Sequence, residues 1–135
     1  MKQSLPSIVA ISYIPCSSLA PNITEKFIAH LPIGVYPLPT AIEHYGNASC
    51  EAEQEYDRYG YVEKTVLQFT TTENIGHYPP LAFVIKDAEG QSYVIGTKEK
   101  PYPMMEVTRS IDKETNIYSY KITFSRRKSL VPCSV

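Results

Sequence analysis

Apolar and polar side chains alternate most clearly near the end of the chain. In the segment over residues 117–125, large apolar side chains occupy every second position from Tyr118 to Phe124, and small polar or charged ones follow each of them. Because successive side chains of a strand point to opposite faces, this pattern predicts a strand with one packed face and one wet face. Further strands are predicted over residues 81–85, 92–97 and 104–110, with a turn at residues 87–90 between the first two.

The first half of the chain is less regular. A strand is predicted over residues 5–14. A Pro-rich early region follows it, where no central strand is expected because proline has no N–H group to donate. One short helix is expected near residues 22–31, since Asn22 can cap its first turn and Pro32 stops it. Residues 33–36 offer an alternative, an edge strand that covers the sheet.

The segment over residues 50–59 allows two interpretations. As a strand it puts Glu51, Glu53 and Glu55 on one face and the apolar side chains on the other. As a helix it has favourable residue types, but few of its apolar side chains align at helical spacing. We predict the strand, as the first arm of a hairpin that turns near residues 57–60.

Length and composition fit one globular domain. The chain has 135 residues, of which 43% are hydrophobic and 20% charged, and its eleven Tyr and eleven Pro favour strands and loops over helices. About seven strands at hairpin-like spacing predict a mainly β fold, either an antiparallel sandwich or a small barrel. We expect a single β domain over residues 1–125 and an extended C-terminal tail over residues 126–135.

Charge and cysteine content limit the partners and the cellular location that we expect. A net charge of −1 provides no global field to attract nucleic acid, so no specific nucleic-acid partner is expected. No apolar run reaches the roughly 18 residues of a membrane span, and the apolar stretch near the N-terminus is too short for a signal peptide. We therefore expect synthesis in the cytoplasm without a signal peptide. Cys16, Cys50 and Cys133 are odd in number, which favours reduced thiols; one disulfide with a free thiol is the alternative.

Candidate catalytic chemistry is sparse. His30, His44 and His77 lie in no nucleophile motif, no Cys or His pair has zinc-ligand spacing, and the glycines form no phosphate loop. We therefore expect no enzyme, no metal and no cofactor. The acidic strip over residues 51–55 is expected to be a solvated or partner-facing surface more than a calcium site.

Two groups of residues are candidates for interaction. Tyrosines lie near the predicted turn at residues 57–60, where exposed Tyr would offer a large contact area; packing across the hairpin is the alternative. The predicted tail carries basic and apolar side chains that would order on a neighbouring chain. The interaction candidates are Tyr56, Tyr59, Tyr61, Arg126, Arg127, Lys128, Leu130 and Val131.

A strand ending in Ile-Gly-Thr, a Pro-bearing connection and a polar hairpin follow one another over residues 92–124. In Ser92-Tyr93-Val94-Ile95-Gly96-Thr97 and the later Pro101-Tyr102-Pro103, the chain resembles small virion or tail-assembly proteins of phages and prophages. The resemblance implies a β-rich subunit that acts through repeated contacts with its neighbours, with the virion as its destination. It carries over no catalytic residue.

These observations lead to three functional hypotheses. The first is a non-catalytic structural or assembly protein, a homo-oligomer or a partner of other assembly subunits, such as a phage tail or connector component. The second is a ligand-binding β module for carbohydrate or peptide, with Tyr56, Tyr59 and Tyr61 as its platform. The third is a small enzyme with a site assembled across loops from His44, His77 and the acidic strip.

Overall fold

The computed structural model describes residues 2–4, 7–19, 21–30, 33–34, 39–57, 60–76, 80–99 and 102–133. The described strands form two five-stranded antiparallel sheets, and they close no barrel. Sheet A contains, in spatial order, β1 (Lys2–Ser4), β4 (Tyr45–Asp57), β5 (Gly60–Thr71), β9 (Thr115–Arg126) and β8 (Met104–Asp112). Sheet B contains β10 (Val131–Cys133), β7 (Ser92–Ile95), β6 (Leu81–Asp87), β2 (Ile8–Pro15) and β3 (Thr40–Ile42). The mainly β fold is confirmed, and the sandwich is the architecture that the structure supports.

The helical elements are short. A 3-10 turn, η1 (Cys16–Ser18), follows β2, and α1 (Ile23–Ile28) confirms the helix expected near residues 22–31. The backbone carbonyl of Asn22 accepts the N–H of Lys26 at 2.9 Å, so the helix begins where the capping pattern predicted. Within the described segments, none of the helices has the length and apolar character needed to span a membrane.

Two long hairpins build most of sheet A. β4 and β5 pair Tyr56 with Tyr61 and Asp57 with Gly60, which confirms the strand interpretation of residues 50–59. β8 and β9 are joined by a two-residue turn at Lys113 and Glu114. Both turn residues have positive φ (48° and 69°), the backbone geometry whose twist suits a tight hairpin.

Sheet A is buried on one face only. β9 buries Tyr120, Ile122 and Phe124, and the side chains between them are more exposed, as the alternation predicted. β4 buries Cys50 and Ala52 in the same way. We call the face that packs on sheet B the inner face of sheet A, and the opposite, solvent-facing side its outer face.

Sheet B is buried on both faces. Phe83 and Ile85 on β6 pack in the cluster between the two sheets, whereas Val84 and Val94 pack in a second cluster that includes Ile23 of α1. Residues 82–85 are therefore four consecutive buried positions. A strand covered on both sides gives such a continuous apolar run and no alternation.

The N-terminal half differs from the prediction in several places. The strand expected over residues 5–14 corresponds to β2, which lies inside sheet B, and residues 5 and 6 lie outside the described residues. β1, at the edge of sheet A, precedes the predicted range and was not predicted. β3, which was not predicted, is an edge strand that follows the Pro-rich region. In the alternative edge strand over residues 33–36, Ile33 is buried and Gly34 forms one bridge, while residues 35 and 36 lie outside the described residues.

The C-terminal segment is not the predicted extended tail. β9 continues to Arg126, and β10 pairs with β7 in sheet B, so no boundary separates the last residues from the domain. Leu130 and Val131 are each 2% exposed. The expectation failed because the partners of this segment are remote in the sequence: the Glu63 carboxylate accepts the backbone N–H groups of Ser129 (2.9 Å) and Leu130 (2.8 Å).

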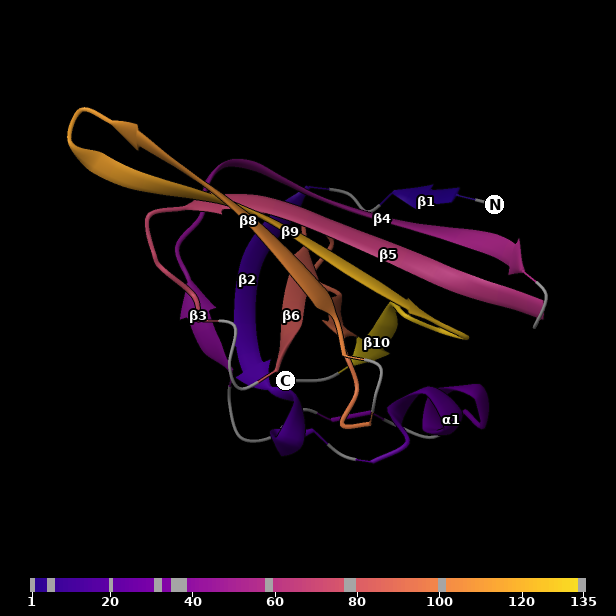
Figure 1. Ribbon diagram of the computed structural model, residues 1–135. Helices are drawn as coiled ribbons and strands as arrows, with labels where there is room; N and C mark the ends of the chain where they lie inside the picture. The colour runs from indigo at the N-terminus through magenta and orange to yellow at the C-terminus, as the bar shows by residue number, and fades with distance from the viewer. Residues whose placement is uncertain are drawn as a thin grey trace.

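The two sheets do not cover each other completely. The strands of sheet B run across those of sheet A, and the β8–β9 hairpin ends well beyond sheet B on one side, while the β4–β5 hairpin ends beyond it on the other (Figure 1). The inner face of sheet A is therefore uncovered at both ends. These two ends and the open outer face are the surfaces on which function can be sought.

Candidate functional site

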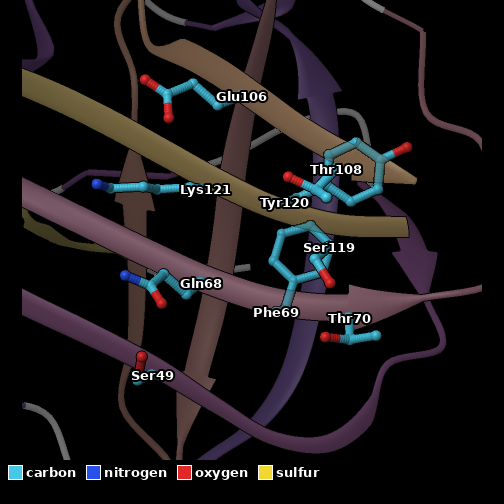
Figure 2. Close-up of a pocket in the computed structure, with 9 residues that line it drawn as sticks. All are labelled: Ser49, Gln68, Phe69, Thr70, Glu106, Thr108, Ser119, Tyr120 and Lys121. Carbon is cyan, nitrogen blue, oxygen red and sulfur yellow. The ribbon is translucent and has the colours of Figure 1, made fainter. Parts of the chain in front are cut away.

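A shallow hollow of about 350 Å³ lies on the outer face of sheet A (Figure 2). Two cross-strand rows of polar side chains line it, and the register of the sheet places the members of each row directly opposite one another. The first row is Ser49, Gln68, Lys121 and Glu106, on β4, β5, β9 and β8. The second row is Thr70, Ser119 and Thr108.

The floor of the hollow is backbone. Phe69 and Tyr120 also line it, but their side chains lie on the inner face, where the two rings stack with centroids 5.3 Å apart. The buried rings fix the strands beneath the hollow, and the ring of Tyr120 is held further because its hydroxyl accepts the N–H of Ile75 at 2.8 Å. The polar side chains thus project from a rigid support.

The hollow has no net charge and many unused hydrogen-bonding groups. Lys121 and Glu106 contribute one positive and one negative charge, and the other polar side chains are hydroxyls and one amide. Within the described part of the chain, none of the seven polar side chains makes a hydrogen bond or an ion pair. Such a surface can bind a neutral molecule that has several donors and acceptors.

The end of the β4–β5 hairpin carries two exposed aromatic side chains. Tyr56 is 75% exposed and Tyr61 is 69% exposed, and their rings meet edge to face with centroids 5.2 Å apart. Their register with Cys50 and Leu67 puts both on the inner face, beyond the reach of sheet B. Both sequence alternatives, exposure and packing across the hairpin, therefore hold for this pair. Tyr59 lies outside the described residues.

The end of the β8–β9 hairpin carries apolar side chains that the sequence did not single out. Val107 and Ile111 lie on the inner face, opposite Tyr120 and Asn116, and are 39% and 67% exposed. Between them Arg109 donates two hydrogen bonds to the side-chain carbonyl of Asn116, at 3.0 and 2.8 Å. The alternation of β8 contained the signal, but only the end of sheet B shows that this part of the strand is uncovered.

The basic candidates near the C-terminus are largely engaged within the chain. The ammonium of Lys128 lies 3.2 Å from the Glu63 carboxylate and 5.5 Å from the centre of the Phe27 ring. Arg126 lies 4.0 Å from the carboxylate of Glu99. Arg127 is exposed. Since Leu130 and Val131 are in the core, this segment does not form the interaction arm that the sequence predicted.

The described groups that were proposed for an assembled enzyme site lie in different parts of the structure. His44 lines a hollow beside β2 and β3 together with Glu43, whereas Glu51, Glu53 and Glu55 are exposed on the outer face of sheet A. His77 lies outside the described residues. Within the described ranges, no group of three or more His, Cys, Asp or Glu side chains is placed to hold a metal ion.

The three cysteines are buried free thiols. Burial raises the pKa of Cys16 and of Cys133 to about 11, and burial, with the nearby Glu51 and Glu63 charges, raises that of Cys50 to about 12. Since the thiolate is the reactive form, these side chains are poor nucleophiles at neutral pH. They belong to the packing of the core.

Comparison of the chain with protein-family models, with curated proteins and with solved structures finds no match. The surfaces described above are therefore the basis for a functional inference. They are the polar hollow on the outer face of sheet A and the two uncovered ends of its inner face.

Proposed function

We propose that this protein is a non-catalytic structural subunit that acts through contacts with copies of itself. One observation carries the proposal: sheet A is longer than sheet B, and its inner face bears exposed apolar side chains at both uncovered ends. Elsewhere the same face is the wall of the hydrophobic core. Exposed apolar side chains at the two ends of a face that elsewhere packs in the core are suited to contact with another chain.

The exposed side chains are of the kind that stabilise interfaces. Tyr56, Tyr61 and Ile111 are each about two-thirds exposed or more. Covering one such side chain contributes on the order of 1–2 kcal/mol through apolar burial. Aromatic side chains are enriched among the residues that dominate binding energy. A few such contacts, repeated by symmetry, stabilise an assembly. The pattern over residues 92–124, which resembles small phage virion proteins, fits the same role.

Self-association tests the proposal. We expect sedimentation velocity to show a mass that rises with protein concentration to a multiple of that of one chain. A variant with Tyr56→Ser and Tyr61→Ser, or with Ile111→Ser, should weaken this association at least tenfold, and should not change the melting temperature at a concentration where the chain is dissociated. Val9→Ser is the matched control, because Val9 is an exposed apolar side chain on β2, away from the hairpin ends. A chain that stays monomeric up to its solubility limit, or an association that no hairpin variant weakens, would refute the proposal.

The polar hollow favours a second function, binding of a small carbohydrate. Its volume lies at the lower end of the ~300–1,000 Å³ of small-molecule sites, so it would take one or two sugar units. Its neutrality favours an uncharged ligand, and its hydroxyl, amide and charged ends match the hydroxyl groups of a sugar. The tyrosine pair is a poorer platform, because its rings meet edge to face and offer no flat double surface.

An NMR titration with glucose, galactose, mannose and N-acetylglucosamine tests this second function. We expect saturable shifts of backbone amides around the hollow with at least one sugar, with a dissociation constant on the order of 1 mM for so open a site. Ser119→Ala should weaken binding several-fold. Ser125→Ala should not, although Ser125 is equally an exposed serine on the outer side of β9. Absence of shifts with all four sugars, or shifts with inorganic phosphate alone, would exclude carbohydrate binding.

A further inference from the structure

The four edges of the two sheets are unequal. Three are formed by three-residue strands, β1, β3 and β10, which offer little backbone for another strand to join. The fourth is β8, which has nine residues. β8 contains no proline and pairs with β9 without a register shift, so no bulge distorts it. It is the one long, regular edge in the described part of the chain.

We propose that β8 pairs in antiparallel orientation with β8 of a second copy, which joins the two copies of sheet A into one continuous ten-stranded sheet. This inference rests on the proposed structural function and names the surface and the partner. The unpaired N–H and C=O groups along β8 gain backbone hydrogen bonds, as in other cases of strand addition. The edge meets an identical edge, which suits a two-fold axis.

Symmetry restricts the register of this pair. In an antiparallel pair, directly opposed residues share a face of the sheet. The two-fold axis must therefore lie midway between one residue and the same residue of the second copy. An axis level with the gap between two successive residues would oppose side chains that lie on different faces. An axis at Thr108 pairs all nine residues of β8, because Thr108 is the middle residue of the strand. An axis at any other residue shortens the pairing.

The charges of β8 agree with an axis at Thr108. With this axis Glu106 faces Ser110 of the second copy, and Arg109 faces Val107. An axis at Glu106 would oppose two glutamates, and an axis at Arg109 would oppose two arginines, each a destabilising arrangement. Thr108 itself faces Thr108, a pair that is favourable on a sheet.

The same register covers exposed apolar surface. Ile111 faces Met105 of the second copy, and both lie on the inner face. This contact occurs twice by symmetry. It covers Ile111, the most exposed of the large apolar side chains on the inner side of β8. The proposed pairing therefore accounts for an apolar residue near the end of a hairpin that sheet B does not reach.

Cysteine cross-linking tests the pairing directly. Across the axis, the Cα atoms of directly opposed residues lie roughly 4.5–5.5 Å apart, within the ~4.4–6.8 Å that a disulfide spans. We expect Thr108→Cys to form a covalent dimer rapidly under a mild oxidant and to return to one chain on reduction. Ser119→Cys is the control, because Ser119 lies beside Thr108 on the same face but one strand further in. In the proposed dimer the two substituted positions are roughly 14 Å apart, so cross-linking is at least tenfold slower.

A charge at the axis gives a second, non-covalent test. Thr108→Asp would oppose two carboxylates between the two Glu106 side chains, and we expect it to raise the dimer dissociation constant at least tenfold. Ser119→Asp should leave that constant unchanged. If the wild-type chain associates while Thr108→Cys fails to cross-link and Thr108→Asp associates normally, the β8 pairing is wrong and the structural function stands through another surface. A wild-type chain that never associates overturns both.

Discussion

Replacing Glu63 by alanine removes the group that holds the C-terminal segment onto the sandwich. Glu63 lies on the inner face of β5 and is buried. One of its carboxylate oxygens accepts the backbone N–H groups of Ser129 and Leu130 and the hydroxyl of Ser129, at 2.9, 2.8 and 3.2 Å. The other lies 3.2 Å from the ammonium of Lys128. We expect Glu63→Ala to destabilise the protein strongly.

The magnitude follows from the groups that lose their partner. Two backbone N–H groups remain in residues that are almost fully buried, and each unsatisfied group costs roughly 1–3 kcal/mol. The partly exposed ion pair with Lys128 adds at most about 1 kcal/mol. The expected loss is about 3–5 kcal/mol, a large part of the ~5–15 kcal/mol that keeps a domain folded. Glu63→Gln retains an acceptor oxygen and should cost about 1–2 kcal/mol.

Urea denaturation measures this loss. The chain has no Trp, so far-UV circular dichroism or Tyr fluorescence follows unfolding. Glu55→Ala is the matched control, since Glu55 is an exposed glutamate on the same hairpin and should change stability by less than about 0.5 kcal/mol. A free energy of unfolding for Glu63→Ala within about 0.5 kcal/mol of the wild-type value, at an unchanged denaturant slope, would refute the reasoning.

Thiol labelling separates local release from global unfolding. Cys133 lies on β10, at the end of the segment that Glu63 holds, whereas Cys50 lies in the core between the sheets. If β10 detaches alone, Cys133 reacts with a thiol reagent faster in Glu63→Ala than in the wild type, and Cys50 does not. Equal acceleration of both would show that the variant opens as a whole.

Two further predictions concern the core. Burial raises the pKa of each of the three thiols from 9.0 to about 11 or 12, so above pH 9 the unfolded chain releases protons that the folded chain keeps. The free energy of unfolding should therefore fall as pH rises, and at pH 10 it should be about 1.4 kcal/mol per thiol below its value at neutral pH. Urea midpoints that stay constant from neutral pH to pH 10 would contradict this expectation. Alanine at all three positions should reduce the dependence of stability on pH. Gly96→Ala should cost about 2–4 kcal/mol, because Gly96 has φ +133° and the new Cβ would lie 2.6 Å from the Cβ of Ala82. Gly90→Ala, at φ +90° with nothing within 4 Å, is the control and should cost about 1 kcal/mol in the same melting experiment.

The parts of the fold that follow from local pattern were predictable. The alternation of β9 and of β4 reports a sheet with one buried face, and both strands were found where the pattern placed them. The apolar run over residues 82–85 predicted a strand, but its burial on both faces depends on α1 and the second core cluster, which no local pattern reveals. The prediction of an extended C-terminal tail was wrong for the same reason, since Glu63 and Ser129 meet across 66 positions of sequence.

The candidate sites were less predictable than the strands. Ser119 and Lys121 were expected on the wet face of β9, and they are exposed there. Their neighbours Gln68 and Thr108 come from other strands, and the register that aligns them is fixed by turns elsewhere in the chain. The tyrosines near the β4–β5 turn were identified from the sequence alone, because both the turn and the aromatic residues beside it are visible in a short stretch of residues. The exposure of Ile111 depends on where sheet B ends.

The proposed dimer would bring the two candidate surfaces of sheet A together. Glu106 and Thr108 line the polar hollow and also lie on the edge strand β8. With the two-fold axis at Thr108, the hollows of the two copies meet on the same outer face and form one groove across the joined sheet. A ligand that spans this groove would bind the dimer more tightly than one chain and, by linkage, would stabilise the dimer to the same extent. Ligand binding and subunit contact are then two uses of one sheet and not competing functions.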